Sequence, residues 1–154
     1  MTDLSAPALA TQLLHSARCV LAVQQGRSLG DVLPAVPAAL RPGVQALSFH
    51  ALRQLGTTQA VLGLLAPRAP QAAVAALLCQ AMALLLDADA PGVRYAPHTV
   101  VDQAVEAARN DRRTARQAAF VNACLRRLLR ERDALLARAL QDPVARWNHP
   151  RWWI

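Results

Sequence analysis

The sequence predicts an all-α fold, a helical bundle built as one domain. The chain has 154 residues, the size of a single domain that buries about two thirds of its unfolded surface around one core. Hydrophobic residues make up 54% of the chain, but aromatic residues only 4%. Most of the apolar residues are Ala, Leu and Val, and they recur with the spacing of helices. We therefore expect about seven helices that pack their apolar faces together.

The first quarter of the chain predicts a long helix, a short helix and a connector. Ser5 is a suitable N-cap for the first helix, and Gly26 is a suitable terminator. Apolar residues at helical spacing mark the buried side of this helix: Leu9, Leu13, Ala17, Val20 and Leu21. Residues 28–33 predict a short helix, and the prolines within residues 34–43 predict a connector.

The middle of the chain predicts three more helices. Apolar spacing predicts a helix over residues 44–55 that stops at Gly56, and a short helix over residues 58–66. Residues 71–86 are the most apolar run and predict the central buried helix. Because Gln80 interrupts this run, and because it is shorter than the ~20 residues that span a bilayer, it does not predict a membrane helix.

The last third predicts a loop followed by two helices. Residues 87–97 have the composition of a loop, and residues 98–108 predict the next helix. A turn over residues 109–114 then leads into a long helix over residues 115–139. Asp142-Pro143 is expected to close this helix.

Apolar and basic side chains lie on different sides of the long helix. At about 100° per residue, one arc collects apolar residues: Val121, Cys124, Leu125, Leu128, Leu129, Leu135, Leu136 and Ala139. The opposite arc collects arginines: Arg116, Arg126, Arg127, Arg130 and Arg138. Arg126 and Arg130 are like-charged neighbours one turn apart, and a phosphate backbone would relieve their repulsion. The alternative is a solvated face that local pairs stabilise, such as Arg127 with Glu131.

The chain is strongly basic, and its charge is unevenly distributed. The formal net charge is +7, with an isoelectric point near 11.1, and all 17 basic residues are arginine. Nine of the 17 lie between Arg109 and Arg138. A basic excess confined to one region is typical of a surface that binds a polyanion, most often nucleic acid, although basic bundles without such a ligand are common.

No group of residues in the sequence predicts catalysis or metal binding. The four histidines lack helical pairing and metal-ligand spacing to cysteine: His15, His50, His98 and His149. Cys19, Cys79 and Cys124 lie within apolar patterns and predict buried thiols in a reducing compartment. Asp102 and Glu106, one turn apart, predict surface or salt-bridge roles. The glycines are isolated, and the start lacks the features of a signal peptide, so we expect a cytoplasmic binding protein with no cofactor site.

All three tryptophans fall within the last eight residues: Trp147, Trp152 and Trp153. Tryptophan at a free chain end is unusual, because exposing its large apolar ring is unfavourable. We therefore expect this segment either to fold back on the bundle or to pack against another part of a larger protein.

Four segments, in this order and spacing, resemble the NusB-like domain. They are Gly26-Arg-Ser-Leu-Gly-Asp-Val-Leu-Pro34, Ser48-Phe-His-Ala-Leu-Arg53, Pro97-His-Thr-Val-Val-Asp-Gln-Ala-Val-Glu106 and Phe120-Val-Asn-Ala-Cys-Leu-Arg-Arg127. The closing Asn148-His-Pro-Arg-Trp-Trp153 is similar to the junction after that domain in the Sun/Fmu family, the ribosomal RNA small-subunit methyltransferase B proteins.

The resemblance implies a NusB-type bundle over residues 1–141 and the start of a linker over residues 142–154. In the family, a separate catalytic domain follows and uses S-adenosylmethionine to methylate carbon 5 of a cytosine in small-subunit ribosomal RNA. The 154 residues carry neither its cofactor loop nor its Pro-Cys nucleophile motif, so by itself this chain is not expected to be an enzyme. The implied partners are that RNA and the methyltransferase domain, with no membrane.

The resemblance and the arginine arc together name the candidate site residues. The RNA-binding candidates are Arg18, Arg53, Arg116, Arg126, Arg127 and Arg130. Asn122 is expected to make a structural hydrogen bond to a neighbouring loop or helix end. One alternative is a freestanding antitermination factor, although Arg18 stands alone on a helix where NusB-type proteins concentrate arginines. A second alternative is a structural domain that docks the catalytic half while its positive charge is incidental.

Overall fold

The computed structural model describes residues 8–87 and 95–149, and within them every regular element is helical. The predicted all-α class is confirmed, with eight α-helices and three short 3₁₀ turns in the described part of the chain. The α-helices are α1 (Leu9–Gln24), α2 (Leu29–Val32), α3 (Arg41–Arg53), α4 (Leu55–Leu65), α5 (Ala72–Leu86), α6 (Pro97–Arg109), α7 (Ala118–Ala139) and α8 (Pro143–Trp147). The 3₁₀ turns are η1 (Leu33–Ala35), η2 (Ala38–Leu40) and η3 (Ala115–Gln117).

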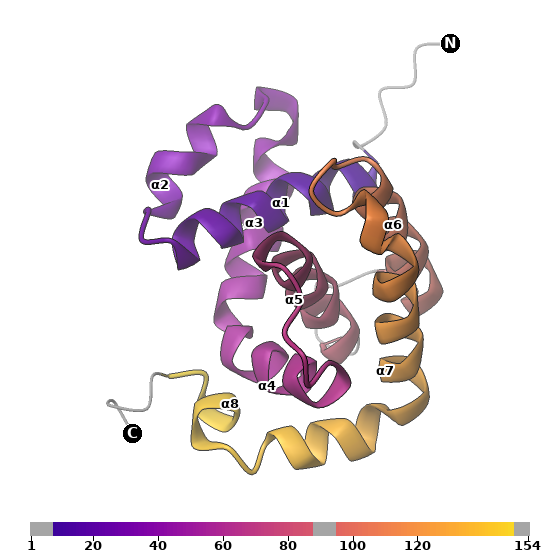
Figure 1. Cartoon of the computed structure of the whole chain (residues 1–154). Coiled ribbons are helices and arrows are strands. Elements are labelled where there is room, and N and C mark those ends of the chain that lie inside the picture. Colours follow the sequence, from indigo (N-terminus) through magenta and orange to yellow (C-terminus); the bar gives the residue numbers. More distant parts are fainter. Residues whose placement is uncertain (1–7, 88–94, 150–154) are drawn as a thin grey trace.

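Helix α5 lies at the centre of the bundle, as its apolar sequence predicts. It packs against α1, α3, α4, α6 and α7, which surround it in Figure 1. Its residues from Ala76 to Leu85 are all buried. Gln80, the polar residue in this run, is satisfied internally: its amide donates to the Leu47 carbonyl at 3.1 Å, and its Oε1 accepts a hydrogen bond from Ser16. The buried amide therefore fixes α5 to α1 and α3.

The predicted first helix is confirmed where the structure describes it. All five of its predicted core residues are buried in α1, and Gly26 follows the helix with a φ of +99°, a backbone conformation that favours glycine. The predicted cap Ser5 lies outside the described residues. Ser28 caps α2 by accepting a hydrogen bond from the Asp31 amide.

Two predicted boundaries in the first half of the chain are wrong, and both concern glycine. Pro42 and Gly43 were expected in the connector but belong to the first turn of α3. Proline is tolerated there because the first N–H groups of a helix have no partner within the helix. Gly56 was expected to end a helix but lies in the first turn of α4. A Cβ atom at position 56 would lie 2.5 Å from the Val144 carbonyl oxygen, so this glycine allows close approach of another segment.

The predicted long helix is shorter and less straight than expected. Residues 115–117 form the turn η3, and α7 begins at Ala118. Within α7, Glu131 departs from helical geometry with φ −120° and ψ 21°, which marks a kink. After this kink, the Arg132 guanidinium donates to the Leu86 carbonyl at 2.7 Å, in the last turn of α5. Leu129, assigned to the apolar arc, is exposed.

The segment after α7 folds back on the bundle. Asp142-Pro143 does follow the end of α7, but Pro143 also begins α8, a short helix that the sequence did not predict. Asp142 caps α8 by accepting a hydrogen bond from the Val144 amide at 3.0 Å. Helix α8 packs against α4, beside the lower end of the bundle in Figure 1. Trp152 and Trp153 lie outside the described residues.

Among the helices that the structure describes, none combines the length and apolarity needed to cross a membrane.

Candidate functional site

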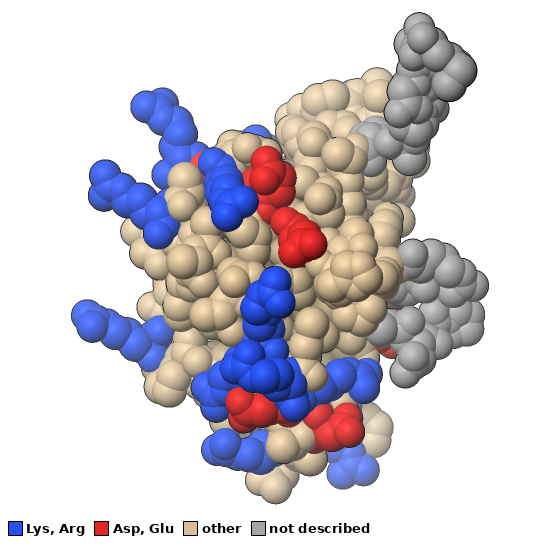
Figure 2. Space-filling view, turned by 90° about the vertical axis from the view of Figure 1, so that its right-hand side faces the viewer, with Lys and Arg blue, Asp and Glu red and all other residues tan. Residues whose placement is uncertain are grey.

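Arginine side chains gather around α6, α7 and the turn between them. Figure 2 looks at the side of the bundle formed by these helices. Basic side chains project from one edge of this face and gather again at its lower end, and acidic side chains lie between them. The arginines of the predicted arc on α7 and η3 are exposed or half-buried, and this face of the bundle also carries acidic side chains.

A hollow lined by several arginines lies beside the turn that precedes α7, where α1, α5 and this turn meet. This arginine groove has a volume of about 700 Å³. Its lining residues are Leu21, Gln25, Gln71, Ala72, Ala73, Arg112, Arg113, Arg116 and Gln117. Three arginines and three glutamines line it, and none of its described lining residues is acidic. Such a groove offers both charge and hydrogen-bond donors to a phosphate.

The N-terminus of α5 adds to the positive potential of the arginine groove. Gln71 and the first residues of α5, Ala72 and Ala73, belong to its lining. Among the described residues, no side chain caps this end of α5. The first backbone N–H groups of a helix have no partner within the helix, and the helix dipole places positive potential at this end. The groove thus combines arginine charge with a helix end that favours anions.

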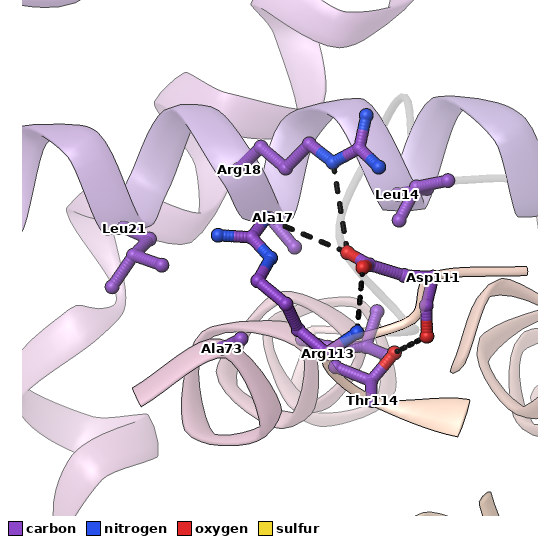
Figure 3. A pocket seen from close by; sticks show the side chains of 9 residues that line it. Leu14, Ala17, Arg18, Leu21, Ala73, Asp111, Arg113 and Thr114 are labelled. Carbon is purple, nitrogen blue, oxygen red and sulfur yellow. Dashed lines mark hydrogen bonds and ion pairs between the residues drawn. The ribbon is translucent and has the colours of Figure 1, made fainter. Parts of the chain in front are cut away.

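Asp111 fixes the turn that carries these arginines. Its side chain is only 7% exposed, and its carboxylate accepts a hydrogen bond from the Arg113 backbone amide at 3.0 Å. The same carboxylate lies 3.6 Å from the Arg18 guanidinium on α1 and 3.5 Å from that of Arg113 (Figure 3). Thr114 donates to the Ala108 carbonyl at 2.8 Å and closes the turn onto the end of α6. The arginine groove is therefore built on a restrained backbone.

The environment of Asp111 keeps it ionised. Burial raises the pKa of this carboxyl, but the hydrogen bonds and charge of Arg113, with a smaller effect of Arg18, outweigh burial and hold the pKa below its ordinary value. A charged Asp111 in turn neutralises part of the positive charge of both arginines. Arg18, expected as an RNA-binding residue, thus has an internal counter-ion.

A second groove, of about 560 Å³, lies between α6 and α7 and has mixed charge. Asp102 and Glu106 line it together with Arg109 and Arg126. Glu106 lies 3.8 Å from Arg109 in an ion pair along α6. Arg126 therefore shares its groove with two carboxylates, which makes it a weaker ligand for an anion than its place on the arginine arc suggested.

The remaining predicted residues are placed as follows. Asn122 was expected to bond to a neighbouring loop or helix end. Instead its side-chain oxygen accepts a hydrogen bond from Arg126 at 3.0 Å, one turn along the same helix. Arg127 pairs with Glu131 at 3.0 Å, as the solvated-face alternative proposed. Arg130 is exposed, and no carboxylate of the described residues lies within 4.0 Å of it. Arg53 is exposed in the last turn of α3 and does not line the arginine groove.

The structure thus brings together residues that the sequence does not mark as neighbours. Only Arg116 of the six predicted arginines lines the arginine groove; Arg112, Arg113 and the glutamines were missed. The adjacent pair Arg112-Arg113 was a visible signal, but it lay in a segment interpreted only as a turn. The glutamines carried no signal, because they come from three separate segments.

The other reactive side chains do not form a site. Cys19, Cys79 and Cys124 are free thiols and are buried, as predicted. Burial raises the pKa of the Cys79 thiol to about 11, although a hydrogen bond with Thr58 partly opposes this effect. Within the described ranges, no three His, Cys, Asp or Glu side chains are grouped so that they could hold a metal ion.

Comparison with known proteins finds a protein family that this bundle resembles. A family model described as the NusB family matches residues 9–130, from the start of α1 to the middle of α7. A search of curated proteins gave no match. The matched region contains all the residues that line the arginine groove, including those of α1 and α5, whereas α8 lies beyond it.

Proposed function

The chain belongs to the NusB family, and from this premise we propose that it is the RNA-binding domain of an S-adenosylmethionine-dependent ribosomal RNA (cytosine-5)-methyltransferase. The family implies RNA binding. The finer assignment, to small-subunit ribosomal RNA and its methylation, is our proposal and draws on the sequence of residues 148–153 as well.

The arginine groove is the observation that carries the RNA-binding proposal. Arg112, Arg113 and Arg116 converge on one hollow at the open N-terminus of α5, without an acidic lining residue. Arginine suits phosphate because its planar guanidinium can donate two parallel hydrogen bonds. Because such contacts read the backbone and not the bases, the groove would supply affinity and orientation with little sequence preference.

The restrained turn explains how this domain could position an RNA. Asp111 and Thr114 hold the turn against α1 and α6, so the backbone that carries its arginines loses little conformational freedom on binding. A rigid groove fixes the path of a bound strand relative to the bundle. A catalytic domain held against the same bundle would then meet a defined nucleotide.

The arginine groove does not fit S-adenosylmethionine. Its sulfonium group is positively charged, and the groove would place that charge among three arginines. We therefore assign no residue of this chain to the cofactor, which in this proposal belongs to a separate catalytic domain. That domain would carry out the methyl transfer, and the present chain would contribute RNA binding.

The methyltransferase assignment rests on the residues that follow α8. Asn148-His-Pro-Arg-Trp-Trp153 resembles the junction before the catalytic domain in the Sun/Fmu proteins. Deleting the gene and mapping 5-methylcytosine in small-subunit ribosomal RNA tests this assignment. Loss of one modified position supports it, whereas an unchanged methylation pattern contradicts it.

The salt dependence of RNA binding tests the groove directly. For single strands, each phosphate neutralised by an arginine contributes about −0.7 to the slope of log K against log salt concentration. We expect the variant Arg112→Gln/Arg113→Gln/Arg116→Gln to bind a single-stranded ribosomal RNA fragment much more weakly, with a slope smaller in magnitude by about 2.

Arg109→Gln is the matched control for this experiment. Arg109 lies on the neighbouring helix but pairs with Glu106 and does not line the arginine groove. The Arg109→Gln variant should leave the RNA affinity and the salt slope nearly unchanged. If Arg109→Gln loses as much binding free energy per removed charge as the triple variant, the effect is one of diffuse charge, and an unchanged slope in the triple variant would exclude the groove as the binding site.

A further inference from the structure

The most exposed aromatic side chain of the described residues lies outside the family match, on α8. Trp147 is 56% exposed. Tryptophan has a large apolar ring, so its exposure is unfavourable unless a ligand covers it for part of the time. Helix α8 has only five residues and buries one of them, Ala145, completely. The helix therefore contributes little core but holds one large aromatic ring at the surface.

Specific contacts hold α8 in place. The Thr57 hydroxyl donates to the Ala145 carbonyl at 2.6 Å, and the Thr57 amide donates to Asn148 Oδ1 at 2.9 Å. Asn148 follows Trp147 directly and ends the helix in the left-handed conformation, with a φ of 54°. Gly56 completes the contact, because a side chain there would collide with the Val144 carbonyl. Trp147 is thus presented on a fixed backbone.

A basic side chain lies against Trp147. The Arg146 guanidinium lies over the indole ring, 5.1 Å from its centroid, in a cation–π contact. Among the described residues, no carboxylate lies within 4.0 Å of the Arg146 guanidinium, although Asp142 caps the other end of this short helix. An occupant of this surface should therefore combine a flat ring with negative charge.

We propose that Trp147 is a stacking site for an unpaired RNA base, with Arg146 binding an adjoining phosphate. A nucleotide has both required features, a flat aromatic base and a phosphate. Proteins that bind single-stranded nucleic acid commonly stack bases on exposed aromatic rings beside arginines. The inference rests on the proposed RNA-binding function but concerns a different surface: α8 packs on α4, away from the turn between α6 and α7 (Figure 1).

Affinity for an RNA strand and for its abasic equivalent separates stacking from phosphate binding. The probe is a single-stranded RNA of about 12 nucleotides, together with a strand of equal length and charge that lacks bases. We expect Trp147→Ala to weaken binding of the intact strand roughly 5- to 150-fold without changing the salt slope. Trp147→Phe should retain most of the affinity. On the abasic strand, wild type and Trp147→Ala should bind equally.

Phe49→Ala is the matched control, because Phe49 is an exposed aromatic residue on α3 and its loss should not change RNA affinity. As an independent readout, RNA should quench the emission of Trp147 in a Trp152→Phe/Trp153→Phe background. Circular dichroism verifies that each variant is folded.

The two proposals fail in different ways. Salt-dependent RNA binding that is equal in wild type and Trp147→Ala overturns the stacking site but leaves the groove intact. If Trp147→Ala binds RNA as well as the wild type but no longer binds the separately expressed catalytic domain, Trp147 belongs to a protein interface. That outcome equally overturns stacking. Absence of all RNA binding overturns both proposals. A Trp147→Ala defect that persists on the abasic strand also contradicts stacking.

Discussion

The carboxylate of Asp111 lies 3.6 Å from the Nε atom of Arg18 and joins the turn after α6 to the first helix. This relationship changes the interpretation of Arg18, which the sequence marked as an RNA-binding arginine on α1. Its charge is balanced by a buried acid of the same molecule, and its position stabilises the turn that carries Arg112, Arg113 and Arg116. We therefore expect Arg18 to contribute to RNA binding mainly by supporting the arginine groove.

Replacing Asp111 should destabilise the fold. Asp111→Ala leaves the Arg113 amide without its acceptor and removes the counter-ion of two arginines, so the free energy of unfolding should fall by about 1–3 kcal/mol. Asp111→Asn keeps an oxygen acceptor for the amide and should lose less. Urea unfolding at neutral pH measures both values, and an Ala variant as stable as the wild type would contradict the structural role.

The contribution of Asp111 should also depend on pH. Because its pKa is lower in the folded state than the ordinary value of 3.8, ionised Asp111 stabilises the fold above that value. The stabilisation is lost as the pH falls through the folded-state pKa. The stability difference between wild type and Asp111→Asn should hence stay constant near neutral pH and shrink below pH 3.8. A difference that grows with acidification would reverse the predicted sign.

Arg127 and Arg130 form a matched pair of surface arginines on α7. Arg127 already pairs with Glu131, whereas Arg130 has no carboxylate within 4.0 Å among the described residues. A free guanidinium can neutralise a phosphate without first losing a protein partner. Arg130→Gln should therefore weaken RNA binding more than Arg127→Gln, as fluorescence anisotropy at constant salt would measure. A larger effect of Arg127→Gln would place the strand on another side of α7.

Two glycines of α4 should respond oppositely to alanine. Gly56→Ala places a Cβ 2.5 Å from the Val144 carbonyl oxygen and should cost about 1–3 kcal/mol of stability while loosening α8. Gly63→Ala meets nothing within 4 Å in a helix interior and should stabilise by about 0.5–1 kcal/mol. Thermal unfolding measures both, and faster tryptic cleavage after Arg146 reports the loosening. If cleavage is unchanged in Gly56→Ala, the close contact does not hold α8.

The buried thiols should be unreactive in the folded protein. Burial raises the pKa of Cys79 to about 11 and raises the pKa of Cys19 and Cys124 as well, so little thiolate exists at pH 8. All three cysteines should react slowly with a disulfide reagent before urea is added and rapidly afterwards. Fast labelling of Cys79 without denaturant would show that α5 opens locally.

Much of the fold could be predicted because helical periodicity identifies buried faces locally. The spacing of Leu9, Leu13, Ala17, Val20 and Leu21 predicted the core face of α1, and the apolar run over residues 71–86 predicted α5 almost to its ends. The helix over residues 98–108 was likewise placed within one residue of α6. Each of these predictions depends on residues within a few turns of one another, which the sequence order itself brings together.

The candidate site was only partly predictable, because its parts meet across long sequence separations. The arginine groove takes residues from α1, from the start of α5 and from the turn before α7, and only Arg116 among them is a predicted RNA-binding residue. Arg126 looked favourable on a helical projection, but packing of α6 against α7 brings Asp102 and Glu106 beside it. A projection of one helix cannot show the charges that a neighbouring helix contributes.

The sequence by itself determined the all-α class, the identity of the central helix and the basic character of the region around α7. The tertiary structure alone decided that Asp111 balances Arg18, where α7 kinks, and that Gly56 makes room for α8. The physical reason is that helix formation and amphipathic burial follow from short-range spacing. Ion pairing and close backbone contact depend instead on distances of a few ångströms between segments that only the packed core brings together.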